Sequence, residues 1–429
     1  MKYAVNIPSL NIDYEVLPSK SVVHRQLIVS FLSQTLSEKP DESIISKIFE
    51  PGDNDNDDIK ATKACLKALY EADKTTDVIM PCKESGSTLR FMISVGAAYL
   101  NYKGFSKTKR LIFLPEGRLI DRPLDQLAEC LKARGVTVET DKNDKKIIVY
   151  GTLSKGTFEI QGNISSQYVS GLLMALILLP EYSVHLEGPL ESKGYFELTI
   201  NTLKKNGFTV IEKDGLYTIA HNNSAKASNT IKAEGDWSSA AFLLCLGALS
   251  ENATINLSGL DKESSQKDRV VTEILEMLGI HTEWHDGCIR LFPQTTKASD
   301  SLELDASDYP DIVPYIAVLA AAFTKSATIK NIERLRYKEC DRVDATIKTL
   351  EAAGVSASED NGILTINGAE KSVTTSDSIE IQTYSDHRIA MMACLVAAWT
   401  KKTVYIDNKE CVNKSFPRLF ELIEKSKSA

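Results

Sequence analysis

Apolar and polar residues follow a pattern that recurs about every 72 residues. Four times, a leucine is followed four positions later by a glycine and then by alternating apolar residues; the glycines are Gly135, Gly207, Gly279 and Gly354. The intervals from 135 to 207, 207 to 279 and 279 to 354 are 72, 72 and 75 residues. Each glycine is typical of the position just past a helix, where the left-handed conformation costs little without a Cβ.

Each of these glycines is followed by two short apolar runs with a turn between them. The turns are Asn143-Asp144, Asp214-Gly215, Asp286-Gly287 and Asn361-Gly362. Asp-Gly and Asn-Gly between alternating apolar runs strongly favour a β-hairpin. The pattern therefore predicts an amphipathic helix followed by a hairpin in each repeat.

A second kind of helix recurs at nearly the same interval. It opens with small or polar residues and continues almost wholly apolar, after Ser165-Ser166-Gln167, Trp237-Ser238-Ser239, Tyr309-Pro310-Asp311 and Tyr384-Ser385-Asp386. Two earlier starts of this kind are Ser19-Lys20-Ser21 and Glu84-Ser85-Gly86-Ser87. A helix that is apolar on all faces is buried. We therefore expect an α/β fold of about six repeats, each with a buried helix, an amphipathic helix and a hairpin.

Length and composition indicate a soluble globular protein of two domains. At 429 residues the chain is too long for one ordinary core. The net charge of −8 and the pI near 5.5 argue against a nucleic-acid-binding surface. The longest apolar runs, residues 172–180 and 242–249, are shorter than the ~18 residues that a membrane span needs.

The cysteines and the N-terminal residues favour a cytoplasmic protein. The eight cysteines are scattered, without a CxxC motif or a metal-like pairing with the six histidines. This distribution is typical of reduced thiols and not of a disulfide framework or a zinc site. Residues 1–6 lead into a strand-like stretch and lack the apolar region of a signal peptide.

Basic residues stand at several of the expected helix starts. Ser and Asp are ordinary N-caps there, but Lys or Arg opposes the helix dipole. Lys20, Lys338 and Arg388 are in this unfavourable position. Helix N-termini that converge favour anions, so we expect a ligand with several negative charges, and Glu339 is the candidate proton carrier among the cations.

Ten short motifs, in order along almost the whole chain, resemble 5-enolpyruvylshikimate-3-phosphate synthase (3-phosphoshikimate 1-carboxyvinyltransferase), the enolpyruvyl transferase family of the shikimate pathway. Any one motif is weak evidence, whereas ten in order are strong. They are Pro18-Ser19-Lys20-Ser21-Val22-Val23-His24-Arg25, Glu84-Ser85-Gly86-Ser87-Thr88-Leu89-Arg90, Asp121-Arg122-Pro123-Leu124, Gly162-Asn163-Ile164-Ser165-Ser166-Gln167, Glu191-Ser192-Lys193-Gly194-Tyr195, Gly235-Asp236-Trp237-Ser238-Ser239-Ala240, Tyr309-Pro310-Asp311, Lys338-Glu339-Cys340-Asp341-Arg342, Ser385-Asp386-His387-Arg388 and Lys414-Ser415-Phe416-Pro417.

The resemblance implies two similar domains, each of three βαβαββ repeats with buried helices inside and sheets outside, hinged by two crossover strands. Domain one would comprise residues 1–18 and 232–429, on the phosphoenolpyruvate side. Domain two would comprise residues 19–231, on the shikimate 3-phosphate side. The cleft between the domains would close on the substrates.

The resemblance also implies the reaction. The enolpyruvyl group of phosphoenolpyruvate is transferred to the 5-hydroxyl of shikimate 3-phosphate by addition and elimination, and phosphate is released. No metal or organic cofactor is needed, because phosphoenolpyruvate carries its own leaving group. The implied protein is a cytoplasmic monomer, a target of glyphosate, with no nucleic-acid or membrane partner.

Site residues follow from the resemblance position by position. Asp311 resembles the base for the hydroxyl, Glu339 the acid and base at the methylene carbon, and Lys20 a further proton-transfer group; which of them moves which proton stays open. The implied ligands of shikimate 3-phosphate are Lys20, Ser21, Arg25, Ser165, Ser166, Gln167, Ser192, Asp311 and Lys338. Those of phosphoenolpyruvate are Lys20, Gly86, Arg122, Gln167, Arg342, Arg388 and Lys414.

Several polar neighbours of these residues are expected to serve the structure. Arg90 is expected to neutralise Glu84, and Asp341 to pair with Arg342 or cap its helix. Lys267-Asp268-Arg269 looks like either a relic of the repeat or a solvated face. Asp236 stays open between a helix cap and a ligand contact.

Two alternative functions remain. The sister enolpyruvyl transferase acts on UDP-N-acetylglucosamine and usually carries a cysteine in an arginine-containing loop, but residues 104–122 contain none. A non-catalytic paralogue that binds anions would have no need of the acids Asp311 and Glu339. Both alternatives are therefore disfavoured.

Overall fold

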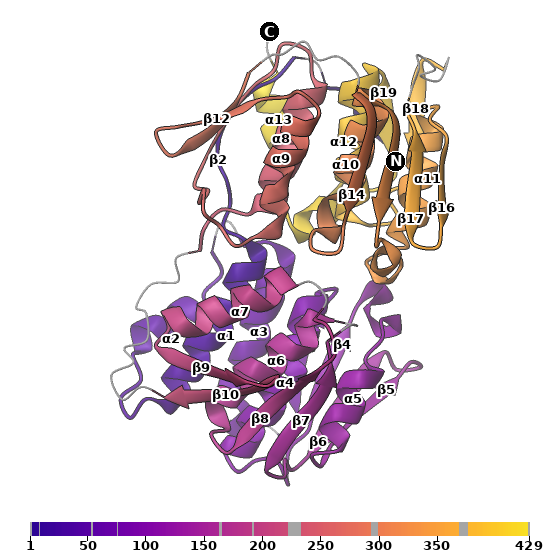
Figure 1. Cartoon of the computed structure of the whole chain (residues 1–429). Coiled ribbons are helices and arrows are strands. Elements are labelled where there is room, and N and C mark those ends of the chain that lie inside the picture. Colours follow the sequence, from indigo (N-terminus) through magenta and orange to yellow (C-terminus); the bar gives the residue numbers. More distant parts are fainter. Residues whose placement is uncertain are drawn as a thin grey trace. The chain divides into compact units, whose positions relative to one another are not determined.

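The computed structural model describes residues 2–7, 9–52, 55–74, 76–162, 165–190, 193–221, 233–292, 299–368 and 376–427. The chain divides into two compact units, coloured along the sequence in Figure 1. Unit 1 consists of Met1–Ser19 and Glu234–Ala429, and unit 2 of Lys20–Ala233. The boundaries expected from the sequence were at 18/19 and 231/232, and the second of these lies outside the described residues.

Unit 2 begins with three helices and continues with two repeats of strand, helix, strand, helix and hairpin. Its helices are α1 (Lys20–Leu36), α2 (Glu42–Phe49), α3 (Asp57–Tyr70), α4 (Gly86–Tyr102), α5 (Asp125–Lys132), α6 (Ser166–Ala175) and α7 (Lys193–Lys205). Its strands are β3 (Val78–Lys83), β4 (Leu111–Pro115), β5 (Val136–Asp141), β6 (Lys146–Gly151), β7 (Gly156–Gln161), β8 (Tyr182–Glu187), β9 (Phe208–Lys213) and β10 (Leu216–His221).

Unit 1 has the same kinds of element, with its first two strands at the start of the chain. Its α-helices are α8 (Trp237–Leu249), α9 (Val271–Met277), α10 (Val313–Phe323), α11 (Arg342–Ala352), α12 (His387–Thr400) and α13 (Leu419–Ser426). Short 3-10 turns η4 (Lys267–Val270), η5 (Pro310–Ile312) and η7 (Glu410–Lys414) matter for the site. Its strands are β1 (Tyr3–Val5), β2 (Asn11–Glu15), β11 (Thr254–Ser258), β12 (Thr282–His285), β13 (Cys288–Leu291), β14 (Ser299–Asp305), β15 (Thr324–Lys330), β16 (Ala357–Asp360), β17 (Ile363–Asn367), β18 (Ser378–Ile381) and β19 (Thr403–Ile406).

Four of the sheets share one topology. Their strand orders are β3-β4-β6-β5, β7-β8-β10-β9, β2-β11-β13-β12 and β14-β15-β17-β16. In each, the first two strands are parallel and the hairpin pairs antiparallel with the second strand. The four hairpins are those expected after Gly135, Gly207, Gly279 and Gly354, so the repeat read from the sequence is confirmed at these places.

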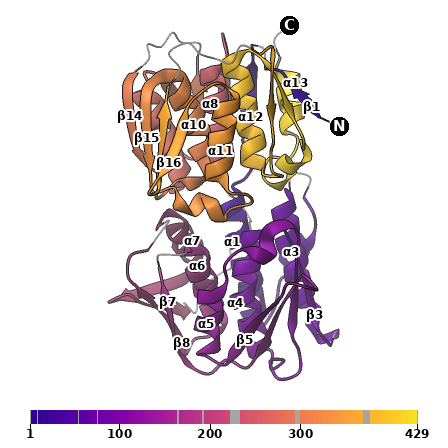
Figure 2. The same ribbon diagram turned by 90° about the vertical axis from the view of Figure 1, so that its right-hand side faces the viewer.

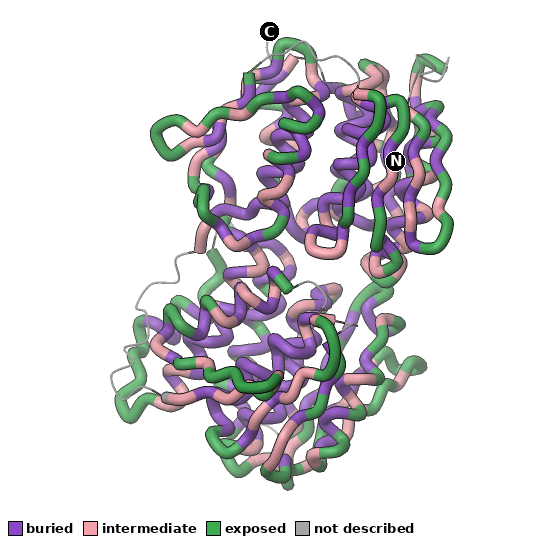
Figure 3. Tube along the Cα trace, in the orientation of Figure 1, coloured by how far each residue is buried: buried purple, intermediate pink, exposed green. Residues whose placement is uncertain are grey.

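Buried helices occupy the inside of each unit and sheets the outside. In unit 1, α8, α10 and α12 pack against one another, and in unit 2 α4 packs against α6 (Figure 1 and Figure 2). Nearly every residue of these five helices is buried, as Figure 3 shows by colour. The expectation that the almost wholly apolar segments form buried helices is confirmed. Among the described residues, no helix combines the length and the hydrophobicity that crossing a membrane requires.

Two of the six expected repeats lack the hairpin. Residues 20–74 of unit 2, as far as the structure describes them, form α1, α2 and α3 and no strand. At the other end of the chain, β18 and β19 are joined by β1 from the N-terminus, in the order β1-β19-β18, where a hairpin was expected. In the part of the chain that the structure describes, the complete βαβαββ unit therefore occurs four times.

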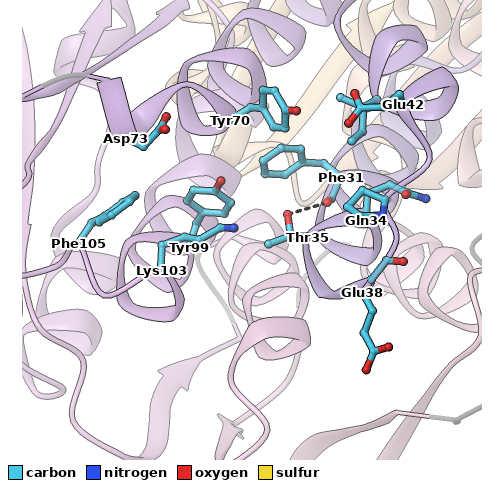
Figure 4. A pocket seen from close by; sticks show the side chains of 13 residues that line it. Phe31, Gln34, Thr35, Glu38, Glu42, Tyr70, Asp73, Tyr99, Lys103 and Phe105 are labelled. Carbon is cyan, nitrogen blue, oxygen red and sulfur yellow. Dashed lines mark hydrogen bonds between the residues drawn. The ribbon is translucent and has the colours of Figure 1, made fainter.

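The helical start of unit 2 leaves a cavity of about 560 Å³ over α1 and α4. Phe31, Tyr70 and Tyr99 form part of its wall (Figure 4). Its charged lining residues are Glu38, Glu42, Asp73 and Lys103. Three carboxylates against one ammonium make this cavity unsuitable for a substrate with several negative charges.

Candidate active site

Arg342 organises the charged residues of unit 1. It is the first residue of α11 and is only 1% exposed. Its Nε donates to Asp386 Oδ2 (2.7 Å), its Nη1 to Asp311 Oδ1 (2.9 Å) and its Nη2 to Glu339 Oε2 (2.7 Å). One guanidinium thus holds three carboxylates from three segments of the chain.

Two lysines complete this cluster. Lys338 Nζ lies 3.1 Å from Asp311 Oδ1, and Lys414 Nζ lies 3.1 Å from Glu339 Oε1. The Glu339 carboxylate is therefore shared between Lys414 and Arg342. Both oxygens of Glu339 thus lie against cations that a substrate anion can also bind.

Arg388 comes from the first turn of α12, next to the N-cap Asp386. Its Nη1 donates to the hydroxyl of Tyr315 (3.0 Å), and its guanidinium lies over the Tyr315 ring, 5.7 Å from the centroid. The two residues before Asp386, Tyr384 and Ser385, both have positive φ, 52° and 54°. This conformation costs a non-glycine residue conformational free energy. The turn that leads into Asp386 and Arg388 at the start of α12 is therefore strained.

The charge of Asp311 is set by its neighbours. Burial alone would raise the pKa of Asp311, but Lys338, Arg388 and Arg342 together hold it well below its ordinary value. Asp311 is therefore ionised in this cluster at neutral pH. Its basicity rises when other anions take over the hydrogen bonds of those cations.

Arg25 is the deeply buried cation of unit 2. It lies on α1, is 2% exposed, and donates from Nε to Thr199 Oγ1 (2.7 Å) and from Nη2 to the Tyr195 carbonyl (2.9 Å). Its Nη1 donates to the Ser21 carbonyl (2.7 Å). Burial lowers the pKa of Arg25 to about 10. Among the described residues, its hydrogen-bond partners are neutral oxygens, which do not balance its charge.

Lys20 and Gly86 stand at the first positions of two neighbouring buried helices of unit 2. Lys20 Nζ lies 2.9 Å from Asp58 Oδ2 of α3. A Cβ on Gly86 would lie 2.6 Å from Arg122 Nη1 and 3.1 Å from Arg90 Nη1. Both guanidinium groups therefore rest against the start of α4, where only glycine leaves them room.

Gln167 connects that arginine pair to the start of α6. Its Oε1 accepts from Arg90 Nη1 (2.8 Å), and its Nε2 donates to Ser87 Oγ (2.9 Å). Ser165 is the N-cap of α6 and accepts from the Gln167 backbone N–H. Ser166 is buried at the next position, whereas Ser192 lies outside the described residues.

The structure thus gathers the expected residues into one group in each unit. The group of unit 1 comprises Asp311, Lys338, Glu339, Arg342, Arg388 and Lys414. The group of unit 2 comprises Lys20, Ser21, Arg25, Gly86, Arg122, Ser165, Ser166 and Gln167, all at or near the starts of α1, α4 and α6.

The expectations for the neighbouring polar residues had mixed outcomes. Asp341 accepts from the Asp344 N–H as the N-cap of α11, as predicted. Asp236 is the N-cap of α8. Arg90 donates to Gln167, a contact within the protein, and its expected pairing with Glu84 stays a prediction. The solvated face expected for Lys267-Asp268-Arg269 is wrong for Asp268, which is 6% exposed.

Sequence reasoning did not assign a role to Tyr315, Asp386 or Asp58. Asp386 lies within a motif that was noticed, and Asp58 follows another aspartate at a helix start, so weak signals existed. Tyr315 gives no signal, because it lies in a continuous apolar run (residues 312–323). Only its contact with Arg388 reveals it.

One group of described residues, on β7 and β8 of unit 2, has spacing suited to a metal ion. Its members are Glu159, His185 and Glu187, and their ligand atoms all lie within 4.8 Å of one another. None of the expected site residues belongs to this group.

Comparison with known proteins identifies the family. The sequence model of EPSP synthase (3-phosphoshikimate 1-carboxyvinyltransferase) matches residues 8–423. The chain belongs to the EPSP synthase family. Among similar members, the 3-phosphoshikimate 1-carboxyvinyltransferase of Clostridium kluyveri is 32% identical over 438 residues, covering 98% of this chain and 96% of that protein. That of Clostridium perfringens strain 13 is 33% identical over 440 residues, covering 98% and 97%.

Solved structures agree with membership in the EPSP synthase family at the level of the fold. An EPSP synthase from Acinetobacter baumannii matches with a TM-score of 0.68 at 19% identity, covering 99% of this chain and 98% of that one. The enolpyruvyl transferase NikO from Streptomyces tendae matches with a TM-score of 0.63 at 14% identity, covering 99% and 97%.

Proposed function

We propose that this protein transfers the enolpyruvyl group of phosphoenolpyruvate to the 5-hydroxyl of shikimate 3-phosphate and releases phosphate. The activity is that of a carboxyvinyl transferase (EC 2.5.1.19) in the biosynthesis of aromatic amino acids. Family membership over nearly the whole chain supports it. The single observation that carries the assignment is Glu339, an acid held between Lys414 and Arg342 beside the ionised Asp311.

The cations of the two groups match the anionic groups of both substrates. We assign shikimate 3-phosphate to Lys20, Ser21, Arg25, Ser165, Ser166, Gln167, Ser192, Asp311 and Lys338. We assign phosphoenolpyruvate to Lys20, Gly86, Arg122, Gln167, Arg342, Arg388 and Lys414. Guanidinium forks suit carboxylates and phosphates, and the helix starts of α1, α4 and α6 add backbone N–H groups.

The resting ion pairs support the following proton transfers. As the substrate anions take over Lys338, Arg342 and Lys414, the carboxylates of Asp311 and Glu339 lose the contacts that keep their basicity low. Asp311 then accepts the proton of the 5-hydroxyl, and the oxygen of that hydroxyl bonds to C2 of phosphoenolpyruvate. Glu339, which takes up a proton from water once the substrate anions have displaced it from its two cations, gives that proton to C3 in the addition and takes one back from the same carbon when phosphate leaves. The proton held by Asp311 departs with the phosphate. Lys20 is a third candidate for these transfers.

The first test is phosphate release by the purified protein with both substrates present. We expect release that depends on both, and absence of release under those conditions would overturn the assignment. UDP-N-acetylglucosamine in place of shikimate 3-phosphate tests the sister activity, and it should give no release.

The second test separates proton transfer from binding at Glu339. Glu339→Gln should keep the substrate affinities within a few fold and lower kcat by about 10² to 10⁴. Glu351→Gln, an exposed glutamate at the end of the same α11, is the matched control and should be unchanged. A Glu339→Gln enzyme with nearly intact turnover would remove the proton role of Glu339.

We further infer that the protein acts as a monomer in the cytoplasm. All eight cysteines are free, and six of them are buried, which suits a reducing compartment. Sedimentation at micromolar concentration should give the mass of one chain, 47.3 kDa, and a stable dimer would contradict this inference.

A further inference from the structure

A buried carboxyl with no role in the proposed reaction lies in η4 of unit 1. Asp268 is 6% exposed, and its Oδ2 accepts a hydrogen bond from Ser238 Oγ at the start of α8. Its Oδ1 is buried and has no hydrogen-bond partner among the residues that the structure describes. Ionisation of a buried carboxyl with one unsatisfied oxygen is costly, so such a group tends to keep its proton.

The groups that act electrostatically or by hydrogen bonding on Asp268 come from three other segments. They are Asp236 and Ser238 at the start of α8, Asp311 in η5 and Arg388 in α12. Burial, then Asp311, raise the pKa of Asp268 to about 7, against the opposing effects of Ser238 and Arg388. Asp311 itself stays ionised because three cations surround it. The pKa values of the carboxyls of Asp268 and Asp311 are thus shifted in opposite directions, which is typical of two carboxyls with different roles.

The proton on Asp268 decides the charge of the cluster in unit 1. The cations there are Lys338, Arg342, Arg388 and Lys414. The carboxylates are Asp236, Asp311, Glu339 and Asp386. With Asp268 protonated the two sets balance; with Asp268 ionised, one negative charge is in excess. An added buried charge acts strongly on an incoming anion, because the local dielectric constant is low.

We propose that Asp268 is a positioning residue that controls the affinity for phosphoenolpyruvate through its own proton. With the proton in place, the cluster accepts the anion; when the proton is lost, Asp268 repels it. Asp268 touches no reacting atom and takes part in no covalent step. The inference rests on the proposed function, because that function supplies the anion.

The test is the pH dependence of the KM for phosphoenolpyruvate in the wild type and in Asp268→Asn, between pH 6 and 9. Ionisation of the substrate phosphate is common to both proteins and cancels in the ratio of their KM values. We expect the ratio of wild type to variant to rise about tenfold across this range, the effect of one buried unit charge. A ratio that is the same at every pH would overturn the proposal.

Ser238→Ala is the second variant, and it keeps the proposal testable if Asp268→Asn does not fold. Ser238 favours the ionised form of Asp268, so its loss should move the inflection of the KM profile to higher pH. A merely structural role would leave the inflection unchanged. Asp344→Asn, which removes a half-exposed acid from the surface of α11, is the matched control and should follow the wild-type profile.

Calorimetry provides a readout that needs no turnover. Phosphoenolpyruvate binding at pH 8, measured in buffers of different ionisation enthalpy, should take up part of a proton in the wild type and less in Asp268→Asn. Equal uptake in the two proteins would contradict the inference. If the wild type releases no phosphate, the proposed function fails; if it turns over normally but the KM ratio is flat, only the role of Asp268 fails.

Discussion

In unit 1 the buried guanidinium of Arg342 faces three carboxylates, whereas in unit 2 the buried guanidinium of Arg25 donates to hydroxyl and carbonyl oxygens. The N-caps of the helices around the two groups differ in a similar way, although Asp41 caps α2 elsewhere in unit 2. Asp236, Asp341 and Asp386 cap α8, α11 and α12, while Ser85 and Ser165 cap α4 and α6. Acidic caps neutralise the helix dipole, and serine caps leave it available to an anion.

This difference separates two ways of preparing an anion site. Arg342 of unit 1 already stabilises the fold through ion pairs, and a substrate must displace those pairs. The described partners of Arg25 in unit 2 are neutral groups, so its charge becomes matched when an anion binds, whereas Lys20 of the same unit already pairs with Asp58. The same residue type should therefore contribute chiefly to stability in one unit and chiefly to affinity in the other.

The largest expected effect is that of Arg342→Met. The substitution leaves Asp311, Glu339 and Asp386 without their shared cation, and such a loss in a buried network costs about 3–5 kcal/mol of unfolding free energy. All three tryptophans, Trp237, Trp284 and Trp399, belong to unit 1, so urea unfolding followed by tryptophan fluorescence measures it. Turnover should also be lost.

Arg336→Met is the control for Arg342→Met. Arg336 pairs with Asp341 and Glu359, but it is 39% exposed, and exposed pairs contribute about 0–1 kcal/mol. If the two variants lost similar stability, the buried network would not be what stabilises unit 1.

Acid should destabilise unit 2 through His24. This residue is fully buried, its Nδ1 lies 2.7 Å from Thr62 Oγ1, and burial lowers its pKa to about 3. Because the unfolded chain takes up the proton near pH 6.5 and the folded chain does not, this contribution is complete above pH 6.5. It is lost as the pH falls towards 3, by on the order of 3 kcal/mol at pH 4.

In His24→Gln, the unfolding free energy, followed by circular dichroism, should fall less between pH 6.5 and 4 than in the wild type. Tryptophan fluorescence, which observes unit 1, should not distinguish the variant from the wild type. His281→Gln, on the surface of unit 1, is the control and should behave as the wild type. An unchanged acid profile in His24→Gln would show that other groups cause the transition.

Arg25→Gln tests the opposite side of the comparison. We expect the KM for shikimate 3-phosphate to rise roughly 30-fold to 1,000-fold, because a buried charge contact to the anion is lost. This change corresponds to about 2–4 kcal/mol of binding free energy. Stability should be unchanged or higher, because an unmatched buried cation is removed. A large loss of stability would mean that Arg25, like Arg342, serves mainly the fold.

The smallest effect is expected for Gly86→Ala. Its Cβ would lie 2.6 Å from Arg122 Nη1, the flexible end of a side chain, so the guanidinium moves and the fold remains. We expect the KM for phosphoenolpyruvate to rise about tenfold with an unchanged melting temperature. Gly96→Ala is the matched control: it would press on Leu111 in the core and cost about 1–3 kcal/mol of stability without changing that KM.

Much of the fold could be predicted because its signals are local. The glycine after each amphipathic helix and the hairpin turn that follows depend on backbone conformations of a few residues. The three-helix start of unit 2 and the use of β1 beside β19 could not be predicted in this way. Strand pairing across the length of the chain has no local signal.

The site, like the fold, has residues that the sequence predicted and residues that it did not. The resemblance of the motifs to the family identified Lys20, Arg25, Asp311, Glu339 and Arg342, and the position at a helix start singled out Lys20 independently. They did not name the partners, since Arg342 and Asp386 are 44 positions apart. Nor did they reveal Asp268, which is flanked by Lys267 and Arg269 and looks exposed in sequence.

The sequence by itself determined the repeat, the buried helices and the chemical groups available for an anionic substrate. Tertiary structure alone decided which cations are paired and which are not, because pairing and desolvation arise only when distant helix starts pack together. The same arginine side chain therefore stabilises the fold in unit 1 and is held ready for an anion in unit 2.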